Sequence, residues 1–445
     1  MNARKAYQMT PEALALSLAR KEKKLKQALE AAANPPAALL LTRAWLTLTS
    51  SQPKSSNEAF SSHQVKILTW NLLAQCLIRR ELFPTSDCLK VALRERCLHE
   101  EILRQNSDIL CLQEVDRLER LLPILENAGY LHHYASGPKK KHGCMIAFKK
   151  DLYSLVSAKV VFYDDEHAGK QGGPPRIASS FKTRNIANLV ALRSKGNEGE
   201  GIIVATTHLF WHPRYTYERI RQLAILIREA TVFRERLSAT SWPCVIAGDF
   251  NFGPSDPAYS LITGDTLLPL QEEMILSSRV VHATRDPSIL ASTSSSVKHS
   301  EDDETEDVDP DRDIVNARPA TKEDRLLEIP EIVEWFSTLP TLCSAYNEGL
   351  YQARRLGTVI PTYGARVELP PGRQGATEPE YTSYTHYWKA VLDYIFFLSP
   401  PEKPIEITGL LTPLRSEDLE PGLPQKRISG SDHTPLVAEM RWVIK

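Results

Sequence analysis

PCVIAGDFN, residues 243–251, places a short apolar run directly before a turn that carries a carboxylate and an amide. The run from Pro243 to Asp249 has the length of a strand and predicts a buried β-strand. Asp249 and Asn251 lie two residues apart on the same turn, so both side chains can point toward one place. This stretch therefore predicts a buried strand whose end presents a compact polar group.

Short apolar strands separated by helical patterns continue on both sides of this stretch. Strands are expected at Val65–Trp70, Asp108–Glu114, Cys144–Phe148, Gly201–His208, Val391–Phe397 and Pro435–Val443. Helices are expected from about Cys88 to Arg104 and from about Arg214 to Leu237. Because strands and helices mix without strict alternation, the sequence predicts an α/β fold with two mixed β-sheets packed face to face and helices outside.

Several of these strands end in polar residues of the same kind. Besides residues 249–251, the strand ends carry Trp70-Asn71, Gln113-Glu114, Thr207-His208, Asp393 and Ser431-Asp432-His433. Each of these residues alone has an ordinary structural explanation, such as a solvated carboxylate, a turn residue or a semi-buried histidine. Two sandwiched sheets bring strand ends to one rim, so the joint occurrence predicts that these side chains converge there.

These motifs resemble the ordered motifs of the endonuclease/exonuclease/phosphatase superfamily. In chain order they are Thr69–Asn71, Leu112–Val115, Thr207–Leu209, Gly248–Asn251, Leu392–Ile395 and Ser431–His433. The segments His208–Pro213 and Tyr384–Ile395 are similar to the carbon-catabolite-repressor-type deadenylase branch. The N-terminal region is similar to fungal RNA exonucleases of the rRNA-processing group. The resemblance spans Val65 to about Val443 and implies the DNase I-like four-layered sandwich.

The resemblance and the local composition divide the chain into three parts. Residues 1–64 are expected to form a basic N-terminal helix and a linker, and residues 65–445 the catalytic domain. Residues 286–324 are predicted to be an acidic disordered insertion within that domain. Within this segment, residues 301–313 hold nine acids and one Arg, so it contains too little apolar surface to order itself.

The overall composition argues against several classes of protein. Hydrophobic residues make up 42% of the 445 residues, which is enough for a sizeable core. No stretch approaches the roughly 18 apolar residues of a membrane span, so no membrane partner is expected. The N-terminus has no apolar signal core, so an intracellular location is expected, in the cytoplasm, the nucleus or both. The seven cysteines form no Cys-x-x-Cys pair, which argues against a zinc site or a disulfide framework.

By resemblance, the chemistry is metal-dependent hydrolysis of a phosphodiester bond. Glu114 is expected to be the direct metal ligand, with Asn71 beside it and Asp432 approaching the metal directly or through water. Carboxylate and amide oxygens without a cysteine cluster suit a hard cation, Mg²⁺ or Mn²⁺.

The resemblance also assigns the reacting groups. Asp249 would orient or deprotonate the attacking water, Asn251 would donate to the pentavalent oxygen, and His208 would donate to a phosphate oxygen. His433 would contact the scissile phosphate, and Asp393 would fix its tautomer and raise its pKa. A general-base role for His433 stays open as the alternative.

Substrate contacts follow from the deadenylase-like segments. Pro213 and Trp388 would flank a base at the 3′ end of the RNA, and Lys389 would touch phosphate. An ordinary surface role for Lys389 is the alternative. His212, Trp388 and Ala390 stand where the deadenylases commonly carry Asp, Phe and Gly, so the resemblance does not extend to a strict preference for adenine.

Together these features lead us to expect a Mg²⁺-dependent 3′→5′ exoribonuclease that acts on single-stranded RNA 3′ ends and releases nucleoside 5′-monophosphates. Deadenylase-like action and trimming of rRNA 3′ ends both fall within this expectation. The alternatives are a phosphatase of the same fold, acting on a small phosphorylated molecule or on RNA ends, and an inactive RNA-binding adaptor. No leucine-rich repeat precedes the domain, so docking to a scaffold through such repeats is not expected, and the sequence identifies no protein partner.

Overall fold

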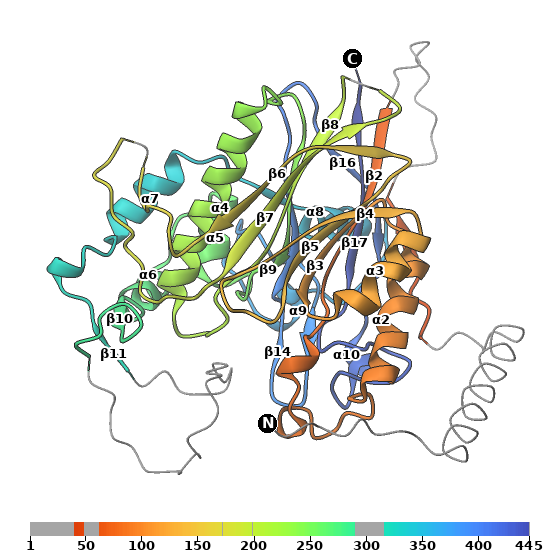
Figure 1. Cartoon of the computed structure of the whole chain (residues 1–445), viewed down its shortest axis with the longest axis horizontal. Helices are drawn as coiled ribbons and strands as arrows, with labels where there is room; N and C mark the ends of the chain where they lie inside the picture. Colours follow the sequence, from red (N-terminus) through yellow and green to blue (C-terminus); the bar gives the residue numbers. More distant parts are fainter. Residues whose placement is uncertain (1–39, 49–61, 171, 198, 290–315, 445) are drawn as a thin grey trace, which may run out of the picture.

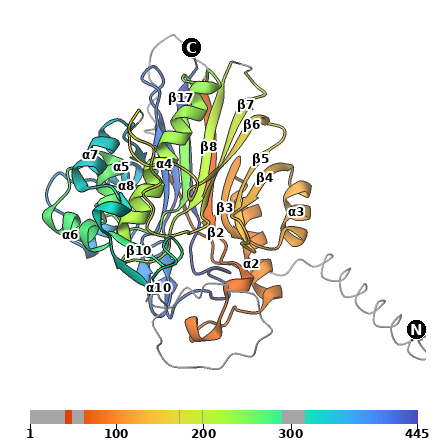
Figure 2. The same ribbon diagram turned by 60° about the vertical axis from the view of Figure 1, so that its left-hand side comes forward.

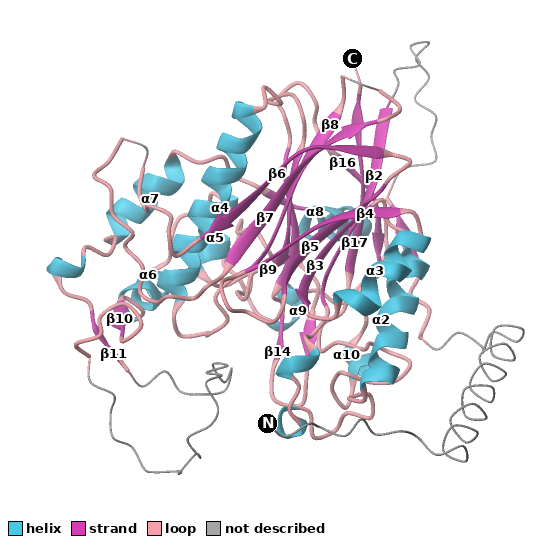
Figure 3. Cartoon of the chain, viewed as in Figure 1, coloured by secondary structure: helices cyan, strands magenta, loops and turns pink. Residues whose placement is uncertain are grey.

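Two β-sheets lie face to face at the centre of the molecule, and helices cover both outer faces (Figure 1 and Figure 3). The structure is a computed structural model that describes residues 40–48, 62–170, 172–197, 199–289 and 316–444. The layers follow the order helix, sheet, sheet, helix, which is the α/β sandwich that the sequence predicts.

Each of the two central sheets combines parallel and antiparallel strands. The first has the order β1-β16-β17-β2-β3-β5-β4. Its strands are β1 (Trp45–Thr47), β16 (Glu406–Leu411), β17 (Leu436–Val443), β2 (Ser62–Asn71), β3 (Ile109–Val115), β5 (Gly143–Lys149) and β4 (Tyr130–Ser136). The second has the order β12-β15-β9-β8-β7-β6. Its strands are β12 (Cys343–Ser344), β15 (Asp393–Leu398), β9 (Cys244–Asp249), β8 (Gly201–His208), β7 (Ile186–Ser194) and β6 (Tyr153–Phe162). Two small sheets pair β10 (Val280–His282) with β11 (Ala317–Pro319) and β13 (Ser383–Tyr384) with β14 (Lys389–Ala390).

Helices form the outer layers, which Figure 2 shows from a second side. α2 (Val91–Gln105) and α3 (Leu118–Asn127) cover the seven-stranded sheet. The six-stranded sheet is covered by α4 (Thr216–Arg236), α5 (Pro257–Thr263), α6 (Pro269–Ser277) and α7 (Ile329–Ser337). The remaining helices are α8 (Ala345–Arg355), α9 (Tyr363–Arg366) and α10 (Ser416–Leu419). Within the described ranges, no helix combines the length and the apolar character that a membrane span needs.

Alternation along the strands divides the core into three layers. In β2, Ile67 packs between the two sheets and the next residue, Leu68, packs under α2 and α3. In β8, Val204 packs between the sheets and Ile203 packs under α4. Because successive side chains of a strand point to opposite faces, one strand serves two core layers. The sandwich is therefore held by apolar contacts on both faces of each sheet.

Two parallel strand pairs determine where the polar strand ends lie. β2 runs parallel to β3 and β8 runs parallel to β9, with α2 and α4 in the connecting segments. The strands of each parallel pair therefore finish at the same edge of their sheet. β15 and β17 run antiparallel to β9 and β2, so their first residues lie at those same edges.

The predicted strands and helices are confirmed with small shifts at their ends, and further strands were missed. The missed strands of the two large sheets are β1, β4, β6, β7, β12 and β16. β4 and β6 lie at sheet edges and expose several side chains, so polar residues interrupt their apolar pattern. Edge strands of this kind resemble loops in sequence.

The described structure includes residues that the predicted domain boundary at 64/65 excludes. β1 pairs with β16, with Trp45 opposite Leu411. The Arg43 guanidinium donates to the carbonyl oxygens of Thr412 and Pro435. A strand of three residues is too short to show a pattern, which is why the prediction assigned it to the N-terminal segment. The predicted basic helix and most of the predicted linker lie outside the described residues.

Both margins of the predicted insertion at 286–324 are ordered. β11 pairs with β10, and Arg318 lies between two carboxylates, 2.8 Å from Asp286 and 2.6 Å from Asp324. Strand pairing and ion pairs hold these residues where apolar burial is scarce. The acidic block at 301–313 lies outside the described residues.

Candidate active site

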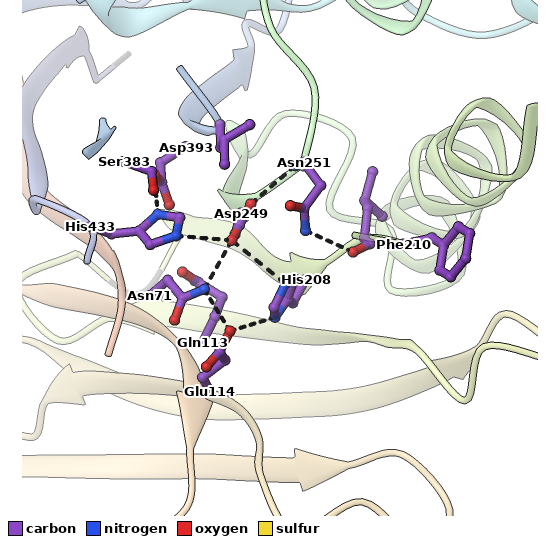
Figure 4. Close-up of polar contacts among 12 residues, drawn as sticks. Asn71, Gln113, Glu114, His208, Phe210, Asp249, Asn251, Ser383, Asp393 and His433 are labelled. Carbon is purple, nitrogen blue, oxygen red and sulfur yellow. Dashed lines mark hydrogen bonds and ion pairs between the residues drawn. The ribbon is translucent and has the colours of Figure 1, made fainter. Parts of the chain in front are cut away.

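Side chains from both sheets meet at one rim of the sandwich (Figure 4). The six that the structure brings together are Asn71, Glu114, His208, Asp249, Asp393 and His433. Strand pairing places Asp249 opposite both His208 and Asp393. Asp249 therefore lies at the centre of the group, with His208 and His433 on opposite sides of it.

Asn71 bridges two carboxylates that belong to different sheets. Its Nδ2 donates to Glu114 Oε1 at 3.0 Å and to Asp249 Oδ2 at 2.9 Å. Its Oδ1 accepts from the backbone N–H of Leu73 at 2.9 Å. Asn71 therefore fixes the spacing of the two carboxylates and lies beside Glu114. Its contact with metal-bound water or with a phosphate oxygen stays a prediction.

Glu114 is held in a strained backbone conformation. Its φ is +54°, in the left-handed region that non-glycine residues seldom adopt. The pairing of β3 with β5 shifts register between Leu112 and Val115, which turns the Glu114 side chain out of the regular strand. The Ala74 N–H donates to Glu114 Oε2 at 2.8 Å, so both carboxylate oxygens are oriented by the protein. Asn251 is also left-handed, with φ +54°. Strain of this kind is concentrated at functional sites.

His433 and Asp393 form a buried pair. His433 Nδ1 lies 2.7 Å from Asp393 Oδ2, and His433 Nε2 lies 3.7 Å from Asp249 Oδ2. Burial opposes a charge on His433, but the attraction of Asp393, Asp432 and Asp249 raises its pKa well above the ordinary value. Asp393 therefore orients the ring of His433 and favours its charged form, and the predicted contact of His433 with the scissile phosphate stays a prediction.

The other histidine has the opposite electrostatic character. His208 Nδ1 lies 3.7 Å from Glu114 Oε1, and His208 Nε2 lies 3.5 Å from Asp249 Oδ2. Burial lowers the pKa of His208 to about 4, so its ring is neutral near pH 7. A neutral ring can still donate one N–H to a phosphate oxygen.

Negative charge is in excess among the buried acids of the site. Burial raises the pKa of Asp249 to about 7, against the attraction of His433 and with the repulsion of Asp393 and Glu114. Burial also raises the pKa of Asp432 to about 6, and the charge of Glu114 adds to this increase. A bound cation would relieve this repulsion.

The site is set in a chain that a family model matches from residue 68 to residue 433. That model describes the endonuclease/exonuclease/phosphatase family. The chain belongs to this family. It is therefore an enzyme that acts on phosphodiester bonds, in the class of nucleases and phosphatases.

Individual relatives within the family cover most of the chain. A probable RNA exonuclease of Schizosaccharomyces pombe, C9B6.11c, is 30% identical over 406 residues, covering 86% of this chain and 77% of the relative. The RNA exonuclease NGL2 of Saccharomyces cerevisiae is 26% identical, covering 91% of this chain and 82% of the relative. The crystal structure of ANGEL2, described as a 2′,3′-cyclic phosphatase, superposes with a TM-score of 0.57 and 21% identity over 91% of this chain and 100% of that chain. That structural likeness shows a shared fold.

Enzymes of the endonuclease/exonuclease/phosphatase family generally use divalent metals, and the donor set of this site fits such an ion. Asp249, Asp393 and His433 form one group whose ligand atoms lie within 4.8 Å of one another. The hydrogen bond between His433 and Asp393 occupies two members of that group. Glu114, Asp432 and Asp249 offer carboxylate oxygens where buried negative charge is in excess, which suits a hard cation.

The predicted substrate residues differ in how the protein uses them. Trp388 is half-buried, its Nε1 donates to Ser383 Oγ at 3.2 Å, and its ring meets Phe83 edge-on at 6.0 Å. Pro213 is exposed beside the site segment that follows β8. Lys389 is exposed, and its Nζ donates to Glu420 Oε1 at 2.9 Å. Whether it touches phosphate stays a prediction.

One positioning residue escaped the sequence analysis. Arg94 of α2 is buried and donates to the carbonyl oxygens of Gly430 and Leu72, both at 2.7 Å. It therefore ties the loop that leads to Asp432 to the loop after β2. The spacing in the sequence indicates this position: Arg94 stands three residues before Cys97, which puts both on the same buried face of α2.

Gly248→Ala is expected to lower both stability and turnover. A Cβ at Gly248 would lie 2.2 Å from the carbonyl oxygen of Thr207 in β8. The two strands would have to separate where they carry His208 and Asp249. We expect the free energy of unfolding to fall by roughly 1–3 kcal/mol, measured by urea denaturation.

Gly253→Ala is the matched control for this substitution. Its Cβ would meet nothing nearer than the Val391 carbonyl oxygen, at 3.8 Å. Its free energy of unfolding should stay within about 0.5 kcal/mol of the parent value. Equal stability of the two variants would show that β8 and β9 are less tightly paired than this structure has them.

Proposed function

We propose that the chain is a Mg²⁺-dependent 3′→5′ exoribonuclease that releases nucleoside 5′-monophosphates from single-stranded RNA. The observation that carries the proposal is the buried network that joins Glu114, Asn71, Asp249, Asp393 and His433. Deadenylase-like shortening and trimming of rRNA 3′ ends are the two kinds of reaction that this proposal covers. Support for RNA as the substrate comes from the alignment of most of the chain with fungal RNA exonucleases.

Two carboxylates, Glu114 and Asp432, would hold the metal ion. Both are buried, and the charge of Glu114 helps raise the pKa of Asp432 to about 6, a repulsion that a cation would relieve. When bound, a divalent cation neutralises phosphate charge and stabilises the charge that develops during displacement. Asn71 keeps Glu114 at a fixed separation from Asp249, which holds the metal ligand and the water-activating carboxylate in place relative to each other.

Asp249 is placed to accept a proton from the attacking water. Its Oδ1 accepts from the N–H of Asn251 at 3.0 Å and its Oδ2 from Asn71, so the carboxylate is held in one orientation. A pKa of about 7, raised chiefly by burial, matches the requirement that a general base exchange protons near neutral pH.

His433 supplies positive charge to the phosphate. Asp393 fixes the ring through Nδ1, which leaves Nε2 directed toward Asp249 and the reacting centre. An imidazolium at that position stabilises the developing negative charge without having to move during the reaction. His208 adds a donor on the other side of Asp249. Asn251 Nδ2 donates one of its two hydrogens to the carbonyl oxygen of Leu209 at 3.0 Å, which leaves the second for the substrate.

RNA of defined ends tests the proposal directly. Full-length protein is incubated with Mg²⁺ and 5′-fluorescein-labelled RNA that ends in a 3′-hydroxyl. We expect a ladder of shortened RNAs and nucleoside 5′-monophosphates, loss of both products in EDTA, and recovery with Mg²⁺ or Mn²⁺. Intact RNA under all metal conditions, with the same protein binding RNA tightly, would favour the inactive adaptor.

A phosphatase that acts on RNA ends is the second candidate. It is supported by the shared fold with ANGEL2, described as a 2′,3′-cyclic phosphatase, and by 26% identity to angel homolog 2 of Danio rerio over 84% of this chain and 64% of that relative. RNA ending in a 3′-phosphate or a 2′,3′-cyclic phosphate separates the two candidates. A phosphatase changes the end group and leaves the RNA length unchanged, whereas the exonuclease shortens the chain.

Trp388→Ala is expected to raise KM for RNA by roughly 5- to 150-fold, which corresponds to the 1–3 kcal/mol of one base–aromatic stack. Much less change is expected in kcat, because stacking is present in both the ground state and the transition state. Steady-state kinetics on poly(A) and mixed-sequence RNA measure the effect, which should be similar for both since every base has a π-face.

Trp388→Phe is the control for the local structural role of the indole. Phenylalanine keeps an aromatic face but loses the hydrogen bond from Nε1 to Ser383. It should recover most of the KM of the parent protein. A Trp388→Ala protein with a lowered melting temperature and an unchanged KM would mean that the indole only packs against Phe83.

A further inference from the structure

Two loops from different sheets meet beside His208. Residues 137–142 connect β4 to β5 in the seven-stranded sheet, and residues 182–185 lead into β7 of the six-stranded sheet. Their backbones touch so closely that a Cβ at Gly137 would lie 1.8 Å from the carbonyl oxygen of Arg184. The contact therefore depends on glycine at residue 137 and fixes one loop against the other.

Lys140 of the first loop is tied to His208 through one side chain. Its Nζ donates to Asn185 Oδ1 at 2.5 Å, and Asn185 Nδ2 donates to the carbonyl oxygen of His208 at 3.0 Å. Among the described residues, Asn185 is the one hydrogen-bond acceptor of the Lys140 ammonium. An ammonium has three donors, so two remain for a ligand.

Charged side chains of both signs surround Lys140: Glu114 and Asp164 attract its ammonium, and Arg184 repels it. Lys139, Lys182 and Arg184 of the same two loops are exposed. Asp164 accepts from the backbone N–H groups of Thr183 and Arg184 at 3.0 and 2.8 Å. Asp164 therefore orders the second loop, and the two loops that meet beside His208 carry four cationic residues in all.

Backbone strain shows that the two loops are held in a defined shape. Lys139 has φ +61° and Arg184 has φ +56°, both in the left-handed region. Each such residue costs on the order of 1 kcal/mol or more and persists where its surroundings determine the conformation. The strain therefore shows that the backbones carrying Lys140 and Asn185 are fixed relative to each other by the surrounding structure.

We propose that Lys140, oriented by Asn185 and assisted by Arg184 and Lys182, binds a second phosphate group of the substrate on the His208 side of the active site. This inference rests on the proposed function, since it takes the reacting phosphate to lie at Asp249 and His433. The ligand is either the next phosphodiester of the RNA backbone or a phosphate at the RNA end. Arg184 and Lys182 extend the contact along the chain.

Binding to an inactive protein tests the proposal without relying on turnover. Full-length Glu114→Gln protein, with and without Lys140→Met, is titrated with a 5′-fluorescein octaribonucleotide in Mg²⁺, and Kd is measured by anisotropy. Lys140→Met should weaken binding about tenfold or more, the effect of one charge-assisted hydrogen bond. The slope of log Kd against log salt should fall by about 0.7, as expected for the loss of one phosphate contact in a single strand.

Neutral linkages identify the phosphate that is bound. A methylphosphonate is placed at each of the four linkages nearest the 3′ end in turn. At the contacted linkage, the Kd difference between the proteins with and without Lys140→Met should shrink to within about twofold, because the charge that Lys140 meets has already been removed. If no linkage does this, but a 3′-phosphate or a 2′,3′-cyclic phosphate enlarges the difference, the contacted group is the terminal phosphate. Either result supports the subsite.

Three controls keep the outcome interpretable. Lys195→Met, at an exposed position between β7 and β8, removes a lysine at the opposite end of β7 and should leave Kd within about twofold of the parent value. Lys140→Arg should retain most of the affinity. If Lys140→Met does not fold, as judged by its melting temperature, Arg184→Gln changes an exposed residue of the same site and should weaken binding at least about threefold.

Unchanged affinity in the folded Lys140 and Arg184 variants would overturn the subsite. Equal weakening on every RNA, irrespective of neutral linkages and end groups, would also overturn it and assign Lys140 to the local structure of His208. A protein that shows Lys140-dependent RNA binding but never shortens RNA would overturn the exonuclease proposal and leave the phosphate subsite standing.

Discussion

Glu114→Gln is expected to reduce turnover at least about a hundredfold, which corresponds to roughly 3 kcal/mol of barrier. The substitution keeps the shape of the side chain but removes the negative charge that would hold the cation. It also places an NH₂ group where both oxygens now accept, from Asn71 Nδ2 and from the Ala74 N–H. One of those two hydrogen bonds to residue 114 must then be lost, although Asn71 keeps its bond to Asp249. The measurement is kcat at saturating Mg²⁺, together with the Kd for Mn²⁺ followed by electron paramagnetic resonance.

Glu119→Gln is the matched control for this change. Glu119 lies in the first turn of α3, and its side chain is 71% exposed. The same chemical change there should leave turnover and metal affinity at the values of the parent protein. Near-normal turnover of the Glu114→Gln protein at saturating Mg²⁺ would contradict the metal assignment, and a melting temperature close to that of the parent would exclude unfolding as the cause of a loss.

Most of the sandwich can be predicted from the sequence because its central strands are buried on both faces. β8 and β9 are continuous apolar runs, and such runs are recognisable without knowledge of their neighbours. β7 is equally buried but was missed, since Asn188 interrupts its apolar run. In the structure Asn188 Nδ2 donates to the carbonyl oxygens of His133 and Cys144 in the other sheet. These hydrogen bonds satisfy the buried amide of Asn188. They are tertiary contacts, which the local sequence pattern cannot show.

The candidate site could be predicted from the sequence for a related reason. Parallel strands end at a common edge, so carboxylates and histidines that follow buried strands can be expected to meet. The structure brings Glu114, Asp249 and His208 together in this way. The hydrogen-bond partner of each polar side chain could not be predicted from the sequence. Lys389 pairs with Glu420, 31 residues away in sequence, and Lys140 pairs with Asn185, 45 residues away.

The distribution of charge within the site explains how side chains at one rim of the sandwich can have different chemical roles. His433, surrounded by three acids, is favoured in its charged form, whereas the buried His208 is favoured in its neutral form. Environments that push the pKa values of like groups apart separate the groups that supply charge from those that only donate a hydrogen bond. Asp249 lies between the two histidines and interacts with both.

Asp393 and His433 are expected to act as one unit, so that their substitutions are strongly non-additive. Asp393→Asn and His433→Ala should each reduce kcat by roughly 10²–10⁴-fold, the range of a positioned proton donor or charged group. The double variant should resemble the worse single variant rather than show the product of the two losses. Asp151→Asn, at an exposed position that follows β5, is the control for the chemical change and should keep the kcat of the parent protein.

The close contact between Asp393 and His433 is the reason that their substitutions should be non-additive. The carboxylate of Asp393 is fully buried, and its Oδ2 lies 2.7 Å from His433 Nδ1. Once the imidazole is absent, orientation and charging of that ring by Asp393 contribute nothing, so the second substitution has little left to remove. Asp393 also belongs to the group of side chains that could hold a metal ion. A role of Asp393 as a metal ligand is therefore the competing explanation, and Mn²⁺ binding distinguishes it from an orienting role. If Asp393 is itself a metal ligand, the losses multiply and Asp393→Asn weakens Mn²⁺ binding in the His433→Ala background, whereas an orienting role leaves Mn²⁺ affinity in that background unchanged.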